Sequence, residues 1–281
     1  MKKALVFTVL ITLATVRFSV KIEAQHNELD NIYVKEHVAN NLPIPYPHVR
    51  EADVYWATRI WRVIDLRERM NLPLYYPTTS MDDRYSLIDL LLFGIRYEGL
   101  PAYGTNDDEF KIEMGVDAVL AAMGAGADTT EVLNVETGMM EMKVIQNEVR
   151  SEEVKQIMVK ELWFFDRNYS RLDVRIIGLC PIREFIDDAG QVQRSQTFWI
   201  NYNEARPLLA RYEVFNARND AQRRSFDDLF LKRYFGSYIV KQSNVYNNRR
   251  IDEYAVGVEA MLESERIKYD IFRMEHDMWE W

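Results

Sequence analysis

The chain has 281 residues, of which 48% are hydrophobic, and this is enough to bury the core of one large domain or two small ones. Its formal net charge of −9 argues against binding to nucleic acid or unaided docking on anionic lipid, since both need clustered Lys and Arg. The single cysteine, Cys180, excludes an internal disulfide; its apolar neighbours indicate a small core residue, with an intermolecular disulfide as the alternative.

The first 24 residues have the pattern of a secretory signal peptide. Lys2 and Lys3 precede an uncharged, mostly apolar run over 4–16, and Ala24 offers a small residue for cleavage. The run is too short and wrongly flanked for a transmembrane helix, and the alternative is a buried N-terminal helix. We therefore expect residues 1–24 to direct export and then to be removed.

Residues 25–48 are predicted to form a proline-containing leader arm. Three prolines at alternate positions fix φ and remove backbone donors, which favours an extended, polyproline-like conformation. These prolines are Pro43, Pro45 and Pro47. The apolar residues between them offer anchors against a neighbouring surface, although a linker is the simpler interpretation.

From Glu51 onwards apolar residues recur at spacings of three and four, which predicts an amphipathic helix that ends before Pro73. The apolar positions are Trp56, Ile60, Val63, Ile64 and Met70. A second helix is predicted from Asp82 to about Arg96, and its nearly continuous apolar residues indicate a buried segment. Residues 115–123 are a short helical candidate.

The middle of the chain is predicted to form antiparallel strands. Apolar residues alternate over 157–165 and again over 172–176, which indicates a long hairpin with its turn near Asn168 and a bulge at Gly178. Residues 197–202 alternate in the same way and add another strand.

Helices are predicted to return after these strands: a short one around Pro207, one from Asp220 to Val240, and a last one from Asp252 to about Met278. The apolar stripe of the last helix consists of Ile267, Ile271, Met274 and Met278. The elements together predict an α+β fold, in which central antiparallel strands at about 155–202 are flanked by helices from both halves of the chain. We expect residues 49–281 to form a single domain that ends in this helix.

Motifs typical of catalysis are missing from the sequence. Of the four histidines, three lie in the leader and one near the C-terminus, and none has a second ligand-type residue at zinc spacing. Without a central histidine, neither Cys180 nor any serine matches a nucleophile–histidine pair. The adjacent carboxylates of Asp227 and Asp228 point about 100° apart on a helix and do not converge on one bond. Asp228 is interpreted as solvated or paired with an arginine.

The sequence predicts neither a cofactor site nor a metal site. Gly124-Ala125-Gly126 lacks the third glycine of a dinucleotide fingerprint, which falls at Thr129, and no Lys-Ser or Lys-Thr follows as in a P-loop. The acidic residues at 107–109 lack the spacing of an EF-hand and indicate a polar turn. We therefore predict no catalytic residue, no cofactor and no metal.

Aromatic residues indicate candidate surfaces for partner binding. Trp56 and Trp61 lie five residues apart, about 140° on a helix, so a single contact does not cover both rings. Phe198 and Trp199 point to opposite faces of a strand. The candidate partner interface consists of these four residues and the three prolines of the arm, Pro43, Pro45 and Pro47. Interfaces are enriched in aromatic residues. The alternative is that other elements of the same chain cover both faces.

Three ordered blocks of the sequence resemble the gliding-motility family GldN and its secretion counterpart PorN. The first contains IWRVIDLRE at 60–68 and NLPLYYP at 71–77, and the second contains VRIIGLCPI at 174–182. The third begins with FWI at 198–200 and continues through EARP at 204–207 and RRSFDD at 223–228 to SNVY at 243–246. The blocks cover roughly residues 50–250.

This resemblance implies a non-catalytic periplasmic subunit of the type IX secretion and gliding machinery. It implies assembly with a GldK/PorK-type lipoprotein into a ring beneath the outer membrane, with contacts between copies of the chain and to the periplasmic part of the motor component GldM/PorM. The lipoprotein would hold the chain peripherally at the outer membrane. The family has no catalytic motif to carry over to these residues.

Two other interpretations stay open. A periplasmic chaperone or carrier for exported cargo would bind client proteins without the lipoprotein. A hydrolase that works with two carboxylates would lose glycan turnover when single buried acids are replaced by neutral residues.

Overall fold

The structure is a computed structural model that describes residues 41–79, 81, 84–105, 108–133, 140–147, 149–187, 190–216, 219 and 222–279. The chain divides into two compact units, Met1–Asn41 and Leu42–Trp281, and the second contains every strand and helix that the described residues form. The predicted signal peptide and the first part of the leader arm lie outside the described residues. Within the described residues no helix has both the length and the apolar character needed to cross a membrane.

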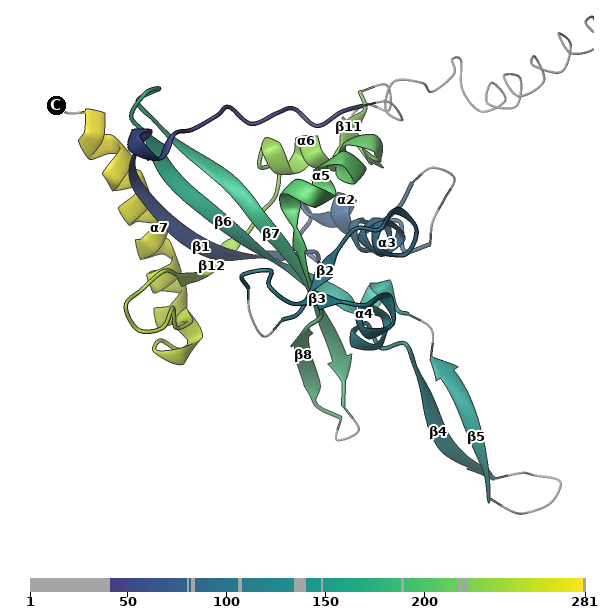
Figure 1. Cartoon of the computed structure of the whole chain (residues 1–281). Helices are drawn as coiled ribbons and strands as arrows, with labels where there is room; N and C mark the ends of the chain where they lie inside the picture. Colours follow the sequence, from purple (N-terminus) through teal and green to yellow (C-terminus); the bar gives the residue numbers. More distant parts are fainter. Residues whose placement is uncertain are drawn as a thin grey trace, which may run out of the picture. The chain divides into compact units, whose positions relative to one another are not determined.

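An antiparallel sheet of eight strands forms the centre of the second unit (Figure 1). Its strands are β1 (Val54–Asp65), β2 (Ala102–Tyr103), β3 (Glu113–Met114), β6 (Val154–Asp166), β7 (Arg171–Ile186), β8 (Val192–Gln196), β9 (Trp199–Asn201) and β12 (Tyr238–Gln242). The order is β12-β1-β6-β7-β9-β2-β3, and β8 pairs with β7. Two small sheets pair β4 (Gly126–Leu133) with β5 (Met140–Asn147) and β10 (Glu213–Val214) with β11 (Arg224–Ser225).

Helices complete the α+β fold, which confirms the predicted class. They are α2 (Leu72–Tyr75), α3 (Leu87–Phe93) with a π-helical extension (Gly94–Glu98), α4 (Val116–Ala122), α5 (Tyr202–Arg211), α6 (Phe226–Leu231) and α7 (Val258–Trp279). Three short 3₁₀ turns cover Glu51–Asp53, Ser151–Glu153 and Ile251–Glu253. The predicted helices over 82–96 and 115–123 and around Pro207 are confirmed, although α3 begins only after Ser86, whose hydroxyl accepts from the backbone N–H of Asp89.

The main core lies between one face of the sheet and the helices α2, α3, α5 and α6. Leu74, Leu90, Leu209 and Phe230 from these helices are buried against strand residues such as Ile157. Figure 1 shows α5 lying beside β7. The predicted buried character of the segment over 82–96 is confirmed, since five of the seven residues of α3 are buried.

The hairpin of β6 and β7 confirms the strand prediction in the middle of the chain. Lys160 pairs with Gly178 and Glu161 with Ile176, so Ile177 is the extra residue of a bulge beside Gly178. A Cβ on Gly178 would lie 2.5 Å from Cζ of Phe110, whose ring packs over the bulge. Glycine is therefore needed here for close approach of a neighbouring ring.

The predicted helix that begins at Glu51 is wrong, because residues 54–65 form the strand β1 between β6 and β12. The first half of β1 alternates between exposed and partly buried side chains. In the second half both faces are covered, with Ile60, Trp61, Val63 and Ile64 all buried. When both faces of a strand are buried, apolar residues no longer alternate with polar ones. The apolar spacings of three and four that remain in β1 resemble those of an amphipathic helix.

The predicted helix from Asp220 to Val240 is wrong over most of its length. The helix α6 ends at Leu231, and β12 begins at Tyr238. Arg233 adopts a left-handed backbone with φ of 55°, through which a right-handed helix does not continue. Its guanidinium Nη1 lies 2.8 Å from Oε1 of the buried Glu161 on β6, and this ion pair favours the reversal that returns the chain to β1.

The last helix is confirmed over Val258–Trp279, although it begins six residues later than predicted, and two of the four residues of its predicted stripe pack on the chain's own sheet. Ile267 and Ile271 of α7 are buried against Ile60 of β1 and Ile239 of β12. The hydroxyl of Ser264 accepts from the backbone N–H of Ile239 at 3.1 Å, so α7 also satisfies part of the outer side of β12.

The carboxylate of Asp65 makes stability depend on pH in the acid range. It accepts hydrogen bonds from Nε and Nη2 of Arg67 at 2.9 and 2.6 Å, and these lower its pKa from 3.8 to about 2. A carboxylate with a lowered pKa in the folded state stabilises the fold above its unfolded pKa and loses that contribution as the pH falls. Between about pH 4 and pH 2 the free energy of unfolding of the wild-type chain should therefore fall more steeply than that of Asp65→Asn. Urea denaturation at several pH values measures this, and parallel curves would contradict it.

Candidate functional site

The structure places the aromatic candidates of the predicted interface in different environments. Trp61 and Trp199 are 2% and 1% exposed on the sheet face opposite the main core, whereas Phe198 is fully buried in that core. Trp56 is partly buried against the cluster beneath α7. Other elements of the same chain thus cover Trp61, Phe198 and Trp199, as the alternative interpretation expected, and the surfaces that remain open lie elsewhere.

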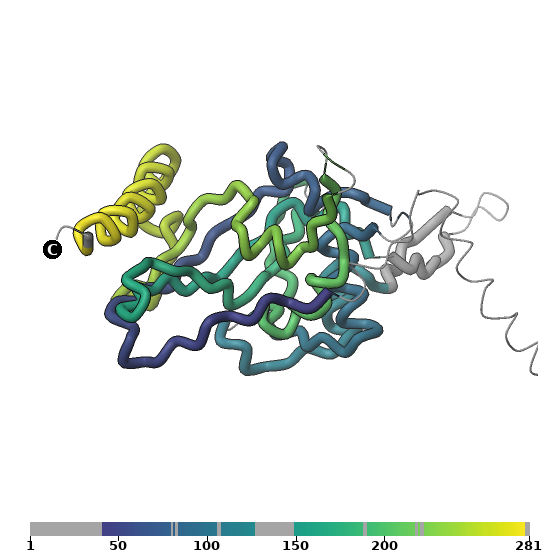
Figure 2. Tube along the Cα trace, turned by 90° about the horizontal axis from the view of Figure 1, so that it is seen from above, coloured from purple at the N-terminus to yellow at the C-terminus, as the bar shows by residue number. Residues whose placement is uncertain are grey.

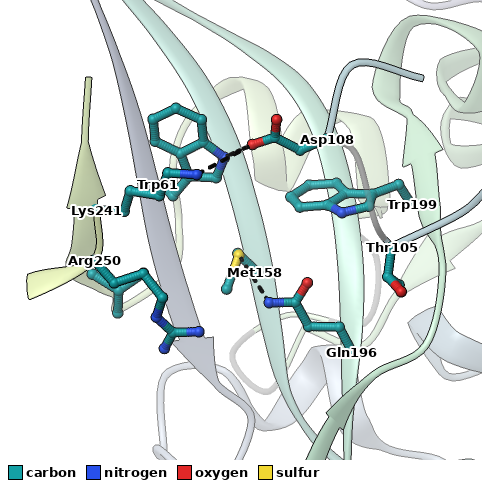
Figure 3. Close-up of a pocket in the computed structure, with 9 residues that line it drawn as sticks. Trp61, Thr105, Asp108, Met158, Gln196, Trp199, Lys241 and Arg250 are labelled. Carbon is teal, nitrogen blue, oxygen red and sulfur yellow. Dashed lines mark hydrogen bonds and ion pairs between the residues drawn. The ribbon is translucent and has the colours of Figure 1, made fainter. Parts of the chain in front are cut away.

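Trp61 and Trp199 border a cavity of about 190 Å³ on this second sheet face (Figure 3). Asp108 lies above it, and its Oδ2 accepts from Nε1 of Trp61 at 2.6 Å. Met158 and Gln196 line the floor, and the Gln196 amide lies 4.0 Å from the Met158 sulfur. One carboxylate and two indole rings therefore meet at this site.

Two lysines complete the surroundings of Asp108. Lys160 places its ammonium 3.4 Å from Oδ1 of Asp108 and donates to the Asp108 carbonyl, and Lys241 lies 3.7 Å from Oδ2. The Lys241 ammonium also lies 4.2 Å from the centre of the Trp61 ring. Burial lowers the pKa of Lys160, and the Asp108 carboxylate opposes that effect. The cluster holds the segment around Asp108 on the sheet, which is a structural role.

A larger groove of about 720 Å³ adjoins this cavity and shares Gln196, Val240 and Arg250 with it. Ile182 and Tyr238 from the sheet lie on one side of the groove, and Ala260, Met261, Ser264 and Glu265 from α7 lie on the other. Its size falls within the range of ligand or side-chain binding sites.

A second charged cluster fixes the end of the leader arm. Arg206 on α5 makes two hydrogen bonds to the carboxylate of Asp227, at 2.9 and 3.0 Å, and the hydroxyl of Tyr202 donates to the same carboxylate at 2.8 Å. The side chains of Arg206 and Asp227 are 7% and 5% exposed. Burial and the neighbouring Asp227 raise the pKa of Tyr202, so its hydroxyl stays a donor.

The arm residues from 42 onwards are extended and pack on two arginines, Arg206 and Arg175. Arg206 donates to the carbonyl of Ile44 and lies 4.2 Å from the centre of the Tyr46 ring. Arg175 of β7 donates to the carbonyl of Pro47, and its guanidinium carbon lies 5.1 Å from the centre of the same ring. The proline-rich segment is thus held on the domain by two guanidinium groups. Pro43 is half-buried, and Pro45 and Pro47 are exposed.

The adjacent acids Asp227 and Asp228 have separate structural roles. Asp227 is bound by Arg206, while Asp228 forms a capping box with Ser225 at the start of α6 and lies 3.7 Å from Lys232. Cys180 is buried, and burial raises the pKa of its thiol, which lowers its reactivity. The described residues contain no group of three or more His, Cys, Asp or Glu side chains placed to hold a metal ion.

The family model of the gliding motility associated protein GldN matches residues 49–280. This range includes all the strands and helices of the described residues, from β1 to α7. A search of the curated proteins finds no match. The resemblance based on three blocks of sequence is confirmed and extends through the C-terminal helix, where those blocks gave no signal. The chain belongs to the GldN family of gliding-motility-associated proteins.

Proposed function

We propose that this chain is a non-catalytic periplasmic subunit of the type IX secretion and gliding machinery. The observation that carries the proposal is the family match over 49–280, which covers most of the chain. In the proposed role the chain assembles with a GldK/PorK-type lipoprotein into a ring, contacts further copies of itself in that ring, and meets the periplasmic part of GldM/PorM. The lipoprotein anchors the ring peripherally at the outer membrane.

The character of the charged clusters supports a structural role. The carboxylate of Asp227 is held by Arg206 and the Tyr202 hydroxyl and fixes the arm. The carboxylate of Asp108 is held by two lysines and the Trp61 indole; it borders the small cavity, but no second carboxylate appears in the described lining of that cavity. Catalytic carboxylates of a glycosidase would instead face each other across a cleft, about 5–10 Å apart. This arrangement favours the structural subunit over the two-carboxylate hydrolase.

The test is a mixing experiment with purified proteins. The chain from residue 25 onwards should be small and soluble alone and should form large particles only when the GldK/PorK-type lipoprotein is added, because closed rings need heterologous contacts between both partners. Light scattering and negative-stain microscopy measure the size. A mixture in which the chain stays small would contradict the ring assembly.

Two controls separate the alternatives. Capture of exported client proteins in the absence of the lipoprotein would favour the carrier.

Cell fractionation tests the location. The mature chain should appear in the outer-membrane fraction when the lipoprotein is present and in the soluble periplasm when it is absent. Cytoplasmic material with residues 1–24 still attached would contradict the proposed location.

A further inference from the structure

The helix α7 carries a second apolar stripe on the side opposite its buried one. Val258, Met261, Leu262, Tyr269 and Phe272 are between 61% and 71% exposed. Ile267 in the buried stripe and Tyr269 in the exposed stripe differ by two residues, about 200° around the helix. Figures 1 and 2 show α7 beside β12 with its other side open. A helix that is apolar on two sides has more apolar surface than its own domain covers.

The exposed stripe has the spacing of a coiled-coil seam. Val258, Leu262, Tyr269 and Phe272 fall at alternating steps of four and three residues, with Glu265 at the one intervening position. The rings of Tyr269 and Phe272 lie together, with their centres 6.4 Å apart. The seam extends from Val258 to Phe272, 15 residues and about 21 Å of helix. This length and spacing suit another helix lying alongside α7.

The seam also joins the large groove. Met261 lies beside the seam and lines the groove, and Glu265, at the intervening seam position, lines it as well. Ile182 and Val240 form part of the groove's apolar lining. A helix on the seam can therefore place side chains into the groove, which adds buried area to an otherwise narrow contact.

The margins of the seam are basic in its central and C-terminal parts. Arg266 and Arg273 follow one margin, and Lys268 lies on the other. On α7 itself, Arg266 forms ion pairs with Glu263 and Asp270. Lys268 pairs with Glu265, and Arg273 pairs with Asp277. The three cations are 57–68% exposed although Glu263 is partly buried, and ion pairs of exposed cations are individually weak, so the cations remain accessible to a partner's carboxylates.

The charges do not favour a second copy of α7 as the occupant. In an antiparallel pair of identical seams, Arg266 would face Arg266 and Lys268 would face Lys268, and these two repulsions offset the two contacts between Glu259 and Arg273 in the same alignment. In a parallel pair, Lys268 would face Arg273. A membrane surface is also disfavoured, because α7 carries six acidic and three basic side chains, whereas helices that lie on membranes have polar faces rich in Lys and Arg.

We propose that the outer seam of α7, together with the adjoining groove, binds an amphipathic helix of another protein whose apolar stripe is flanked by acidic residues. The apolar seam supplies the contact area, and Arg266, Lys268 and Arg273 select the charge of the partner. The inference rests on α7 and the groove beside it and does not depend on the function proposed above.

The test uses two synthetic four-heptad peptides with leucine at the seam positions and either glutamate or lysine at the flanking positions. The full mature chain should bind the glutamate peptide at least about tenfold more tightly than the lysine peptide at low salt, and added salt should reduce this preference. Replacing Arg266, Lys268 and Arg273 together by glutamine should abolish the preference while the variant still binds through its apolar seam. Fluorescence anisotropy measures both affinities.

Seam variants provide the control for apolar contact. Leu262→Gln with Phe272→Gln keeps good helix propensity and should reduce binding of the glutamate peptide more than tenfold, whereas Tyr55→Gln, at a similarly exposed ring on β1, should not. Circular dichroism verifies that each variant is folded. The proposal is overturned if the wild-type chain binds neither peptide, if it shows no charge preference, if it dimerises through α7 instead, or if it binds anionic vesicles instead.

Discussion

Replacing Asp227 by alanine is expected to destabilise the folded domain by about 3–5 kcal/mol. The substitution leaves the guanidinium of Arg206 buried without its carboxylate, and it removes the acceptor of the Tyr202 hydroxyl. Chemical denaturation of the chain from residue 25 onwards measures the loss. The same variant should expose the arm over 42–48 to proteases, since Arg206 also holds the carbonyl of Ile44 and the ring of Tyr46.

The neighbouring Asp228 provides a matched control. Asp228→Ala removes one half of the capping box of α6 and should cost only about 1 kcal/mol. The double variant Arg206→Met with Asp227→Leu replaces both charges by apolar groups of similar size and should recover much of the loss. If Asp227→Ala lowered the unfolding free energy no more than Asp228→Ala does, the ion pair between Asp227 and Arg206 would not be the main contact that holds the arm.

Replacing Trp199 by alanine is the second substitution with a large expected effect, a loss of about 3–5 kcal/mol of unfolding free energy. The ring is 1% exposed, packs with Trp61 and Cys180, and lies edge-on to Phe110 with ring centres 6.1 Å apart. The smaller side chain would leave a hole that rigid neighbouring strands do not close. Denaturation curves at matched conditions measure the change.

This result also separates a core residue from a contact residue. Tyr55→Ala, at a ring that is 71% exposed on β1, should change the unfolding free energy by no more than about 0.5 kcal/mol. If Trp199→Ala kept wild-type stability and lost only assembly with the lipoprotein, the ring would belong to an interface after all.

The elements that the sequence predicted correctly are those whose signal is local. The helix at α3 follows from a nearly continuous apolar run, and the hairpin of β6 and β7 follows from alternation on both sides of Asn168. The buried stripe of α7 has a simple period that no other element disturbs. Residues close in the sequence decide these structures, so their pattern was sufficient.

The elements that were wrong depend on distant partners. The strand β1 takes its neighbours from residues about 100 and 180 positions later, and their coverage of both faces hid its alternation. The contacts that hold the arm join Ile44 and Tyr46 to Arg206, about 160 residues away.

The sequence did contain one indication of the buried ion pair. Arg206 lies on the apolar face of α5, and a buried cation needs a buried acid as its partner. The apolar neighbours on that face are Ala205, Leu208 and Leu209.

The pairing of β1 with β12 has a consequence for how the polypeptide is made. Ile60 pairs with Gln242 and Val63 with Tyr238, so an early part of the chain obtains its last neighbour only when about 240 residues have been synthesised. Until then one side of β1 has unsatisfied backbone groups, which are a template for erroneous association. Products that terminate before Tyr238 should therefore be prone to aggregation, and quality control must tolerate an unfinished sheet until the final sixth of the protein emerges.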